Sequence, residues 1–204
     1  MVQLFLDGGG FMWPILAVLI VGCALVIERL YHLIKGLSSN EDTANKISDC
    51  IKSNNLQEAQ NQCDSTVGPV ANLCHVAIDS ATEGPEETEK SLDQAGTIEM
   101  ASLEKNMSWI SLCIAIAPMI GFLGTVWGMI EAFNDIKMAN DISPAVVAGG
   151  ISVALLTTAF GLVVALILQL LQNTVMYIID NQVVTLQKST SLVINSITDH
   201  FNKK

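Results

Sequence analysis

A run of 38 residues without a single Asp, Glu, Lys or Arg, from Ile142 to Ile179, most constrains the fold of this chain. A helix that crosses the hydrocarbon core of a bilayer needs roughly 20 apolar residues, so the run is long enough for one membrane span with helix to spare. Ser143 is placed to cap the N-terminus of this helix, and Pro144 falls at its first position, where the missing N–H costs nothing. The run predicts a transmembrane helix over residues 144–173.

Small residues recur along one face of this helix. They follow one another at steps of three and four residues, which places them on a single stripe: Gly150, Ala154, Thr158, Gly161 and Ala165. Such stripes let neighbouring helices approach closely in lipid, where the hydrophobic effect gives no drive for association. Thr157 and Thr158 place two hydroxyls on or beside the stripe, and we expect them to face protein or a pore rather than lipid.

Two further charge-free runs exist, Gly8–Ile27 with 20 residues and Asn106–Ile130 with 25. They predict spans over residues 11–34 and 106–133. The second of these carries its own stripe of small residues, with Thr125 beside it: Ala117, Gly121, Gly124, Gly128 and Ala132. No lysine follows these glycines, so a phosphate-binding loop is not indicated. The expected class is an all-α membrane protein with three transmembrane helices and long helices that extend into the cytoplasm.

The positions of the basic residues predict the orientation, because cytoplasmic segments are enriched in Lys and Arg. With the N-terminus outside, nine of the ten basic residues lie inside, and only Lys137 lies outside. The resulting organisation is as follows: a periplasmic N-terminus (1–10), the first span (11–34), a cytoplasmic helical segment (35–105), the second span (106–133, continuing a cytoplasmic helix from about residue 86), a periplasmic loop (134–143), the third span (144–173) and a cytoplasmic C-terminal helix (174–204).

Composition argues against several other classes. The net charge of −10 gives little support to nucleic-acid binding. The five cysteines are odd in number and form no CxxC, which favours reduced thiols. Cys74 and His75, with Cys63 nearby in the sequence, fall short of a metal-ligand set. No His, Cys or carboxylate cluster converges in a span, so we expect neither an enzyme nor a cofactor.

Three blocks of the sequence resemble the ExbB/TolQ/MotA family of inner-membrane ion-channel subunits. Gly9–Leu33 is similar to the family's first span, Leu103–Phe133 to its second and Gly150–Leu162 to its third. The second block is the most specific, through Ala117-Pro118 and the run Gly121-Phe122-Leu123-Gly124-Thr125-Val126-Trp127-Gly128-Met129. Three spans, rather than four, favour the ExbB/TolQ branch.

The resemblance implies a homopentameric ring around a dimer of an ExbD- or TolR-like partner, which has a single span carrying an essential aspartate. Proton flow past that aspartate would drive transport or envelope work through a TonB- or TolA-like periplasmic protein. Thr125 and Thr158 resemble the family's pore threonines, and Thr157 adjoins them. The implied location is the bacterial inner membrane, with the N-terminus in the periplasm and the C-terminus in the cytoplasm.

The chain departs from the family pattern at Val153, where ExbB and TolQ members usually have glutamate. Four interpretations therefore remain open: a proton-driven subunit, a sodium-driven version that uses the two adjacent threonines as oxygen ligands, a flagellar or gliding-type stator subunit, and a non-conducting scaffold. For the threonines themselves, the structural alternative to an ion path is a hydroxyl that only bonds back to a carbonyl one turn earlier in its own helix.

Overall fold

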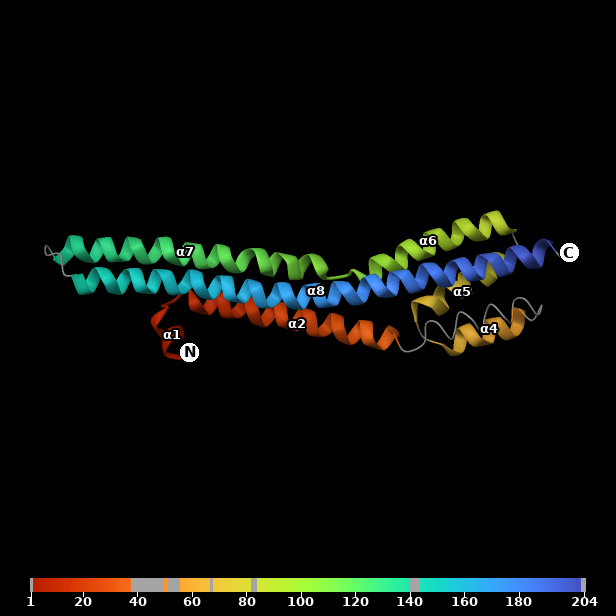
Figure 1. The fold of residues 1–204 in the computed structure, drawn as a ribbon, viewed down its shortest axis with the longest axis horizontal. Helices are drawn as coiled ribbons and strands as arrows, with labels where there is room; N and C mark the ends of the chain where they lie inside the picture. The colour runs from red at the N-terminus through yellow and green to blue at the C-terminus, as the bar shows by residue number, and fades with distance from the viewer. Residues whose placement is uncertain are drawn as a thin grey trace. The chain divides into compact units, whose positions relative to one another are not determined.

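The computed structural model describes residues 2–37, 50, 56–66, 68–81, 84–139 and 144–202. These residues form the helices α1 (Val2–Asp7), α2 (Met12–Leu37), α4 (Leu56–Ser65), α5 (Pro69–Ser80), α6 (Pro85–Leu103), α7 (Met107–Ala139) and α8 (Pro144–Asn202) (Figure 1). No strand occurs among the described residues, and the predicted all-α class is confirmed. The helix cap predicted at Ser143 lies outside them.

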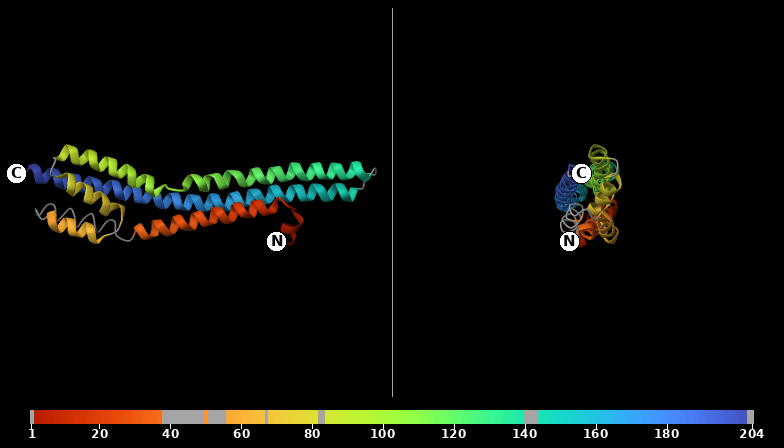
Figure 2. Two further views of the ribbon diagram at one scale, coloured as in Figure 1. Left: turned by 180° about the vertical axis from the view of Figure 1, so that it is seen from behind. Right: turned by 90° about the vertical axis from the view of Figure 1, so that its right-hand side faces the viewer.

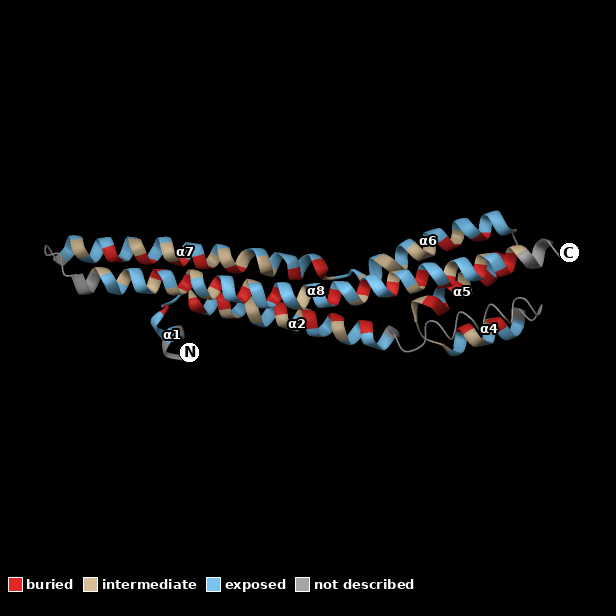
Figure 3. Ribbon diagram, viewed as in Figure 1, coloured by how far each residue is buried: buried red, intermediate tan, exposed pale blue. Residues whose placement is uncertain are grey.

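Three stretches of the described helices are long and apolar enough to cross a membrane: Met12–Lys35, Pro85–Met138 and Val147–Thr198. Large apolar side chains remain exposed on these stretches, as Figure 3 shows for the outer faces of α7 and α8; examples are Phe122, Leu123, Leu155, Leu162 and Leu166. Exposed apolar area on this scale is unusual for a soluble monomer. In a membrane these side chains contact the lipid acyl chains. The chain is a multi-pass membrane protein.

The first of two compact units comprises Met1–Glu28 and Asn106–Val175. Within it α7 runs beside α8, and the span portion of α2 packs against α8 (Figures 1 and 2). The buried centre of this packing consists of Ile15, Ala117, Val164 and Leu168. A Cβ atom on Gly22 would lie 2.6 Å from Cδ2 of Leu168, so the absence of a side chain there lets α2 approach α8.

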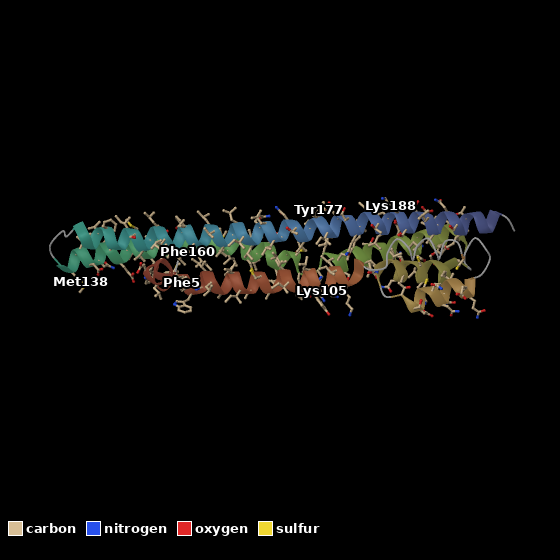
Figure 4. The ribbon with its side chains drawn as sticks, turned by 60° about the horizontal axis from the view of Figure 1, so that its bottom comes forward. Phe5, Lys105, Met138, Phe160, Tyr177 and Lys188 are labelled. Carbon is tan, nitrogen blue, oxygen red and sulfur yellow. The ribbon has the colours of Figure 1, made fainter. Side chains whose placement is uncertain are left out.

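A short N-terminal helix, which the sequence analysis did not predict, precedes α2. Phe5 of α1 packs edge-on against Trp13 and against Phe160 of α8, with ring centroids 5.6 and 6.5 Å apart (Figure 4). Edge-to-face aromatic pairs at such distances are favourable. These contacts hold α1 against the first unit.

The second unit comprises Arg29–Lys105 and Met176–Lys204. Its core draws side chains from α4, α5, α6 and the C-terminal part of α8: Ala59, Cys63, Val70, Leu73, Cys74, Ala77, Ile78, Ala81, Leu92, Leu186, Val193 and Ile197. The last three recur along α8 at spacings of seven and four residues, which places them on one face of the helix. That face therefore contributes to the core of the unit.

The structure differs from the expected continuous helix between about residue 86 and the second span. Helix α6 ends at Leu103 and α7 begins at Met107, with a turn over residues 104–106. Asn106 has a φ of 65°, a conformation that Asn tolerates better than most residues. Its side-chain amide donates a hydrogen bond to Glu28 Oε2 over 3.0 Å, and its carbonyl accepts from the N–H groups of Trp109 and Ile110. No Gly or Pro marks this turn, so the sequence pattern gave no signal for it.

Candidate functional site

The two stripes of small residues meet where α7 packs against α8. A Cβ atom on Gly121 would lie 2.8 Å from the Thr157 carbonyl oxygen, and one on Gly161 would lie 2.6 Å from the Ala117 carbonyl oxygen. Both neighbouring atoms belong to the backbone, so they cannot rotate away. These glycines bring the two helix backbones into direct contact, as small residues do in membrane helix pairs.

The other predicted packing residues lie along the same interface. A Cβ on Gly128 would lie 3.3 Å from Ala154 Cβ, and one on Gly150 would collide with Ala132 Cβ. A Cβ on Gly124 would lie 2.7 Å from the Thr157 hydroxyl oxygen. The missing side chain at Gly124 therefore provides the space that the Thr157 hydroxyl occupies.

The three predicted threonines come together at this interface, Thr125 from α7 and Thr157 and Thr158 from α8. The hydroxyl oxygens of Thr125 and Thr158 are hydrogen-bonded to each other. Thr125 Oγ1 also lies 3.0 Å from the Ala154 carbonyl oxygen, and Thr158 Oγ1 lies 3.1 Å from that of Gly121. These bonds cross between the helices. Thr125 Oγ1 also lies 3.3 Å from the Gly121 carbonyl oxygen one turn earlier in α7, so the site combines back-bonding with bonds between the helices.

Thr157 differs from the other two threonines. It is only 1% exposed, whereas Thr125 and Thr158 are partly exposed. Its hydroxyl lies 2.7 Å from the Ala154 carbonyl oxygen in its own helix and 3.2 Å from that of Gly121 in α7. In this unit Thr157 ties the helices together, and Thr125 and Thr158 form the accessible part of the cluster.

The hydrogen-bond pattern of the accessible pair can run in two directions, because each hydroxyl carries one proton and can both donate and accept. In one direction Thr158 donates to Thr125, and Thr125 donates to the Ala154 carbonyl. In the other, Thr125 donates to Thr158, and Thr158 donates to the Gly121 carbonyl. Rotation of two O–H bonds exchanges the patterns, and in both of them the hydroxyls keep a lone pair for a third group. An O–H that turns away from its carbonyl acceptor presents a proton to that group instead.

A cavity of about 270 Å³ adjoins this cluster on the side of the N-terminal segment. Thr157 and Val153 line it from α8, and Trp127 and Glu131 line it from α7. The Trp127 indole N–H donates a hydrogen bond to Glu131 Oε1 over 2.8 Å. Trp127 and Glu131, which the sequence analysis did not place in the site, are thus neighbours of Val153, and their i, i+4 spacing was the available signal.

Polar contacts continue from the cluster toward the other end of the spans. The side-chain amide of Gln172 in α8 donates to the Ser111 hydroxyl in α7 over 2.6 Å, while that of Gln169 donates to Asn173 in the same helix over 3.1 Å. The first bond links two helices and the second does not. Among the described residues, the partners of these two glutamines are a hydroxyl and an amide.

The cysteine and histidine residues considered as a metal fragment lie in the second unit. Cys63 and Cys74 are buried in its core, and His75 Nδ1 lies 3.0 Å from Asp79 Oδ2. A hydrogen bond from the Cys74 thiol lowers the pKa of Cys63, and the same bond together with burial raises the pKa of Cys74. No group of three or more His, Cys, Asp or Glu with metal-binding geometry occurs in the described part of the chain.

Comparison with known proteins agrees with this architecture. Residues 44–188 match the model of the MotA/TolQ/ExbB proton channel family. A putative biopolymer transport protein ExbB homolog of Methanothermobacter thermautotrophicus is 28% identical over 182 residues, or 89% of this chain and 64% of the relative. This chain thus spans just under two thirds of that relative's length.

Two further relatives indicate which branch of the family this chain is most similar to. The putative biopolymer transport protein ExbB-like 3 of Synechocystis is 26% identical over 91% of this chain and 90% of its own length. The biopolymer transport protein ExbB of Xanthomonas campestris is 40% identical over 78 residues, which are 38% of this chain and 31% of the relative. The chain belongs to the MotA/TolQ/ExbB proton channel family, on its ExbB/TolQ side.

Proposed function

We propose that this chain is the ring-forming subunit of an ExbB–ExbD or TolQ–TolR type complex in the bacterial inner membrane. The complex uses the proton motive force to energise transport or envelope work through a TonB- or TolA-like protein. The observation that carries the proposal is the hydrogen-bonded pair Thr125–Thr158, which is partly exposed at the interface of α7 and α8. The word transport in the names of the relatives supports the same role.

The pair needs a carboxylate from another chain to move protons. No Asp or Glu lies between Glu104 and Glu131, or between Asp141 and Asp180, so the second and third spans hold no acid at mid-membrane. A proton that crosses a membrane requires a titratable group there. An aspartate on the single span of an ExbD- or TolR-like partner, held as a dimer inside a ring of five copies, supplies it.

The two hydroxyls suit such a carboxylate in both of its protonation states. They can donate hydrogen bonds to the charged carboxylate, and they can accept one from the protonated form. For the charged carboxylate, the O–H of Thr125 or Thr158 turns from its carbonyl acceptor toward the partner; for the protonated form it stays on the carbonyl and a hydroxyl lone pair accepts. Thr157, buried beside them, keeps the helices in register during this cycle.

The orientation follows from the charges that flank the spans, with the N-terminus in the periplasm and the C-terminus in the cytoplasm. Each proton that crosses then releases about 2.3 kcal/mol per 100 mV of membrane potential. This is several times the thermal energy, and a few protons per step are enough to move the ring relative to its partner.

Two alternatives rest on specific observations. The hydroxyls of Thr125 and Thr158 and the carbonyls of Gly121 and Ala154 bring four oxygens together, and oxygen ligands suit Na⁺, which favours a sodium-driven subunit. Val153 places an apolar side chain in the cavity where a conducting relative would have glutamate, which favours a non-conducting scaffold.

Ion flux through the reconstituted complex tests the proposal. The full chain, purified with its partner and placed in liposomes, is expected to dissipate an imposed pH gradient in potassium buffer, as followed by a pH-sensitive dye. Liposomes containing this chain without the partner serve as the control and are expected to hold the gradient.

The other outcomes separate the alternatives. Dissipation that requires Na⁺ instead of K⁺ would establish the sodium-driven version. A correctly assembled complex that holds both a pH gradient and a sodium gradient would overturn ion conduction and leave the scaffold.

A further inference from the structure

A second cavity lies wholly within the second unit, away from the threonine cluster. Its volume is about 350 Å³, and residues of α2, α5, α6 and α8 line it. Small-molecule pockets have volumes of about 300–1,000 Å³, so the space is sufficient for a small polar ligand or a lipid headgroup.

Basic side chains from the end of α2 dominate the charge of this cavity. Arg29, His32 and Lys35 line it at steps of three residues, so they project from one side of the helix. Arg29 is the chain's single arginine, is 3% exposed, and also donates to the Ser102 carbonyl over 3.4 Å. A planar guanidinium is the side chain best suited to the oxygens of a phosphate or carboxylate.

One acidic residue, Glu99, also lines the cavity, and its carboxylate accepts a hydrogen bond from the Asn72 amide over 2.9 Å. The fixed charges on the walls are therefore two positive and one negative. In a chain with a net charge of −10, this is a local reversal of sign. The cavity attracts an anion.

The N-terminus of α5 adds backbone donors to the same wall. Gly68 and Pro69 line the cavity, and no side chain caps this end of the helix. Helix N-termini carry unpaired N–H groups and a partial positive charge, which suit phosphate groups. A helix end alone does not define a site, but Gln182 supplies an independent observation.

Gln182 lines the cavity from α8 and is 3% exposed. Its Nε2 donates to the Leu33 carbonyl over 3.0 Å, which fixes the orientation of the amide, because the flipped amide would place two oxygens in contact. Its Oε1 is buried and has no hydrogen-bond partner among the described residues. A buried acceptor without a donor is costly, so this oxygen is available to a donor from a ligand or from an ordered water.

We infer that this cavity binds a phosphate ester that also carries a hydroxyl or ammonium donor. The phosphate lies against Arg29, Lys35 and the N-terminus of α5, and the donor reaches Gln182 Oε1. Two sources share this chemistry: the headgroup of a membrane glycerophospholipid and a soluble phosphate ester. Arg29 lies two residues after Ile27, where the charge-free run of the first span ends, which places the cavity at headgroup depth.

Thermal unfolding of the full-length chain in its delipidated complex, in detergent, tests the inference. Three probes are compared: dioleoylphosphatidylglycerol, which has a phosphate and hydroxyl donors; dioleoylphosphatidylcholine, whose quaternary ammonium has no N–H to donate; and soluble glycerol phosphate. Phosphatidylglycerol is expected to raise the melting temperature at concentrations about tenfold below those that phosphatidylcholine requires, since a hydrogen bond to a buried acceptor that is otherwise unsatisfied changes affinity by about that factor. A soluble ligand is indicated instead if glycerol phosphate acts as well as the lipid.

Substitutions of residues that line the cavity test whether the probe stabilises the protein by binding there. Lys35→Gln and Gln182→Met are each expected to weaken binding of the effective probe by about tenfold. Lys188→Gln and Gln187→Met are the matched controls and should leave the binding unchanged. Both residues are exposed positions of α8 outside this cavity, and Figure 4 labels Lys188. Arg29 is not substituted, because its side chain also bonds to α6. If none of the probes stabilises the protein, or if the cavity variants respond like their controls, the inference is wrong. Proton flux tests the proposed function in a separate measurement, so either conclusion can fail without the other.

Discussion

Replacing Gly161 with alanine is expected to destabilise the complex strongly. The new Cβ would lie 2.6 Å from the Ala117 carbonyl oxygen and 3.2 Å from Gly121 Cα, and both neighbours are backbone atoms that cannot move without separating α7 from α8. Overpacking of a closely packed interface costs about 1–3 kcal/mol. The melting temperature of the purified complex, followed by tryptophan fluorescence, should therefore fall by several degrees, and threonine hydrogen bonding should weaken with it.

Gly149→Ala is the matched control in the same helix. A Cβ at this position meets no atom within 4 Å, and alanine is favoured over glycine in a helix by about 1 kcal/mol. The control should therefore unfold at the same temperature as the unchanged protein or at a higher one. Equal destabilisation by both variants would show that a cause common to both positions, such as lipid contact, and not the α7–α8 contact, determines the effect.

The double substitution Thr125→Val with Thr158→Val is expected to abolish most ion flux while the complex still assembles. Valine keeps the shape of threonine, and removing both hydroxyls together leaves neither with a missing partner. Hydrogen bonds to a charged group contribute about 1.5–3 kcal/mol each, and about 1.4 kcal/mol changes a rate tenfold. Flux in liposomes should thus fall by about 100-fold or more.

Thr174→Val is the control for this experiment. The Thr174 hydroxyl is exposed and bonds back to the Leu170 carbonyl in α8 over 2.9 Å, so its loss should leave flux unchanged. The mass of the solubilised complex checks assembly of both variants. Undiminished flux through an assembled Thr125/Thr158 double variant would remove these hydroxyls from the ion path.

The sequence predicted much of this fold because charge-free runs and small-residue stripes depend on local composition. The stripe from Gly150 to Ala165 and the stripe from Ala117 to Ala132 identify the faces of α8 and α7 that meet in the structure. Spacing alone placed Thr125 and Thr158 on those faces. Their positions therefore followed from helical periodicity.

Other features depend on contacts between residues far apart in the sequence. The turn at Asn106 is held by Glu28, 78 residues away, and no breaker residue announces it. Spacing placed Thr158 on the stripe and Thr157 beside it, but Thr157 is the one buried against Gly124, and Thr158 is partly exposed. The unpartnered oxygen of Gln182 likewise emerges only when α2 and α8 pack together.

The central claim is that Thr125 and Thr158 form the surface on which a partner's carboxylate is protonated and released. A density map of the assembled complex, determined with the partner bound, tests it most directly. The account predicts several copies of this chain in a ring, with both hydroxyls directed at the partner's helix and within hydrogen-bonding distance of its aspartate. Hydroxyls directed at the acyl chains of the surrounding lipid, or a complex in which this chain is a monomer, would contradict it.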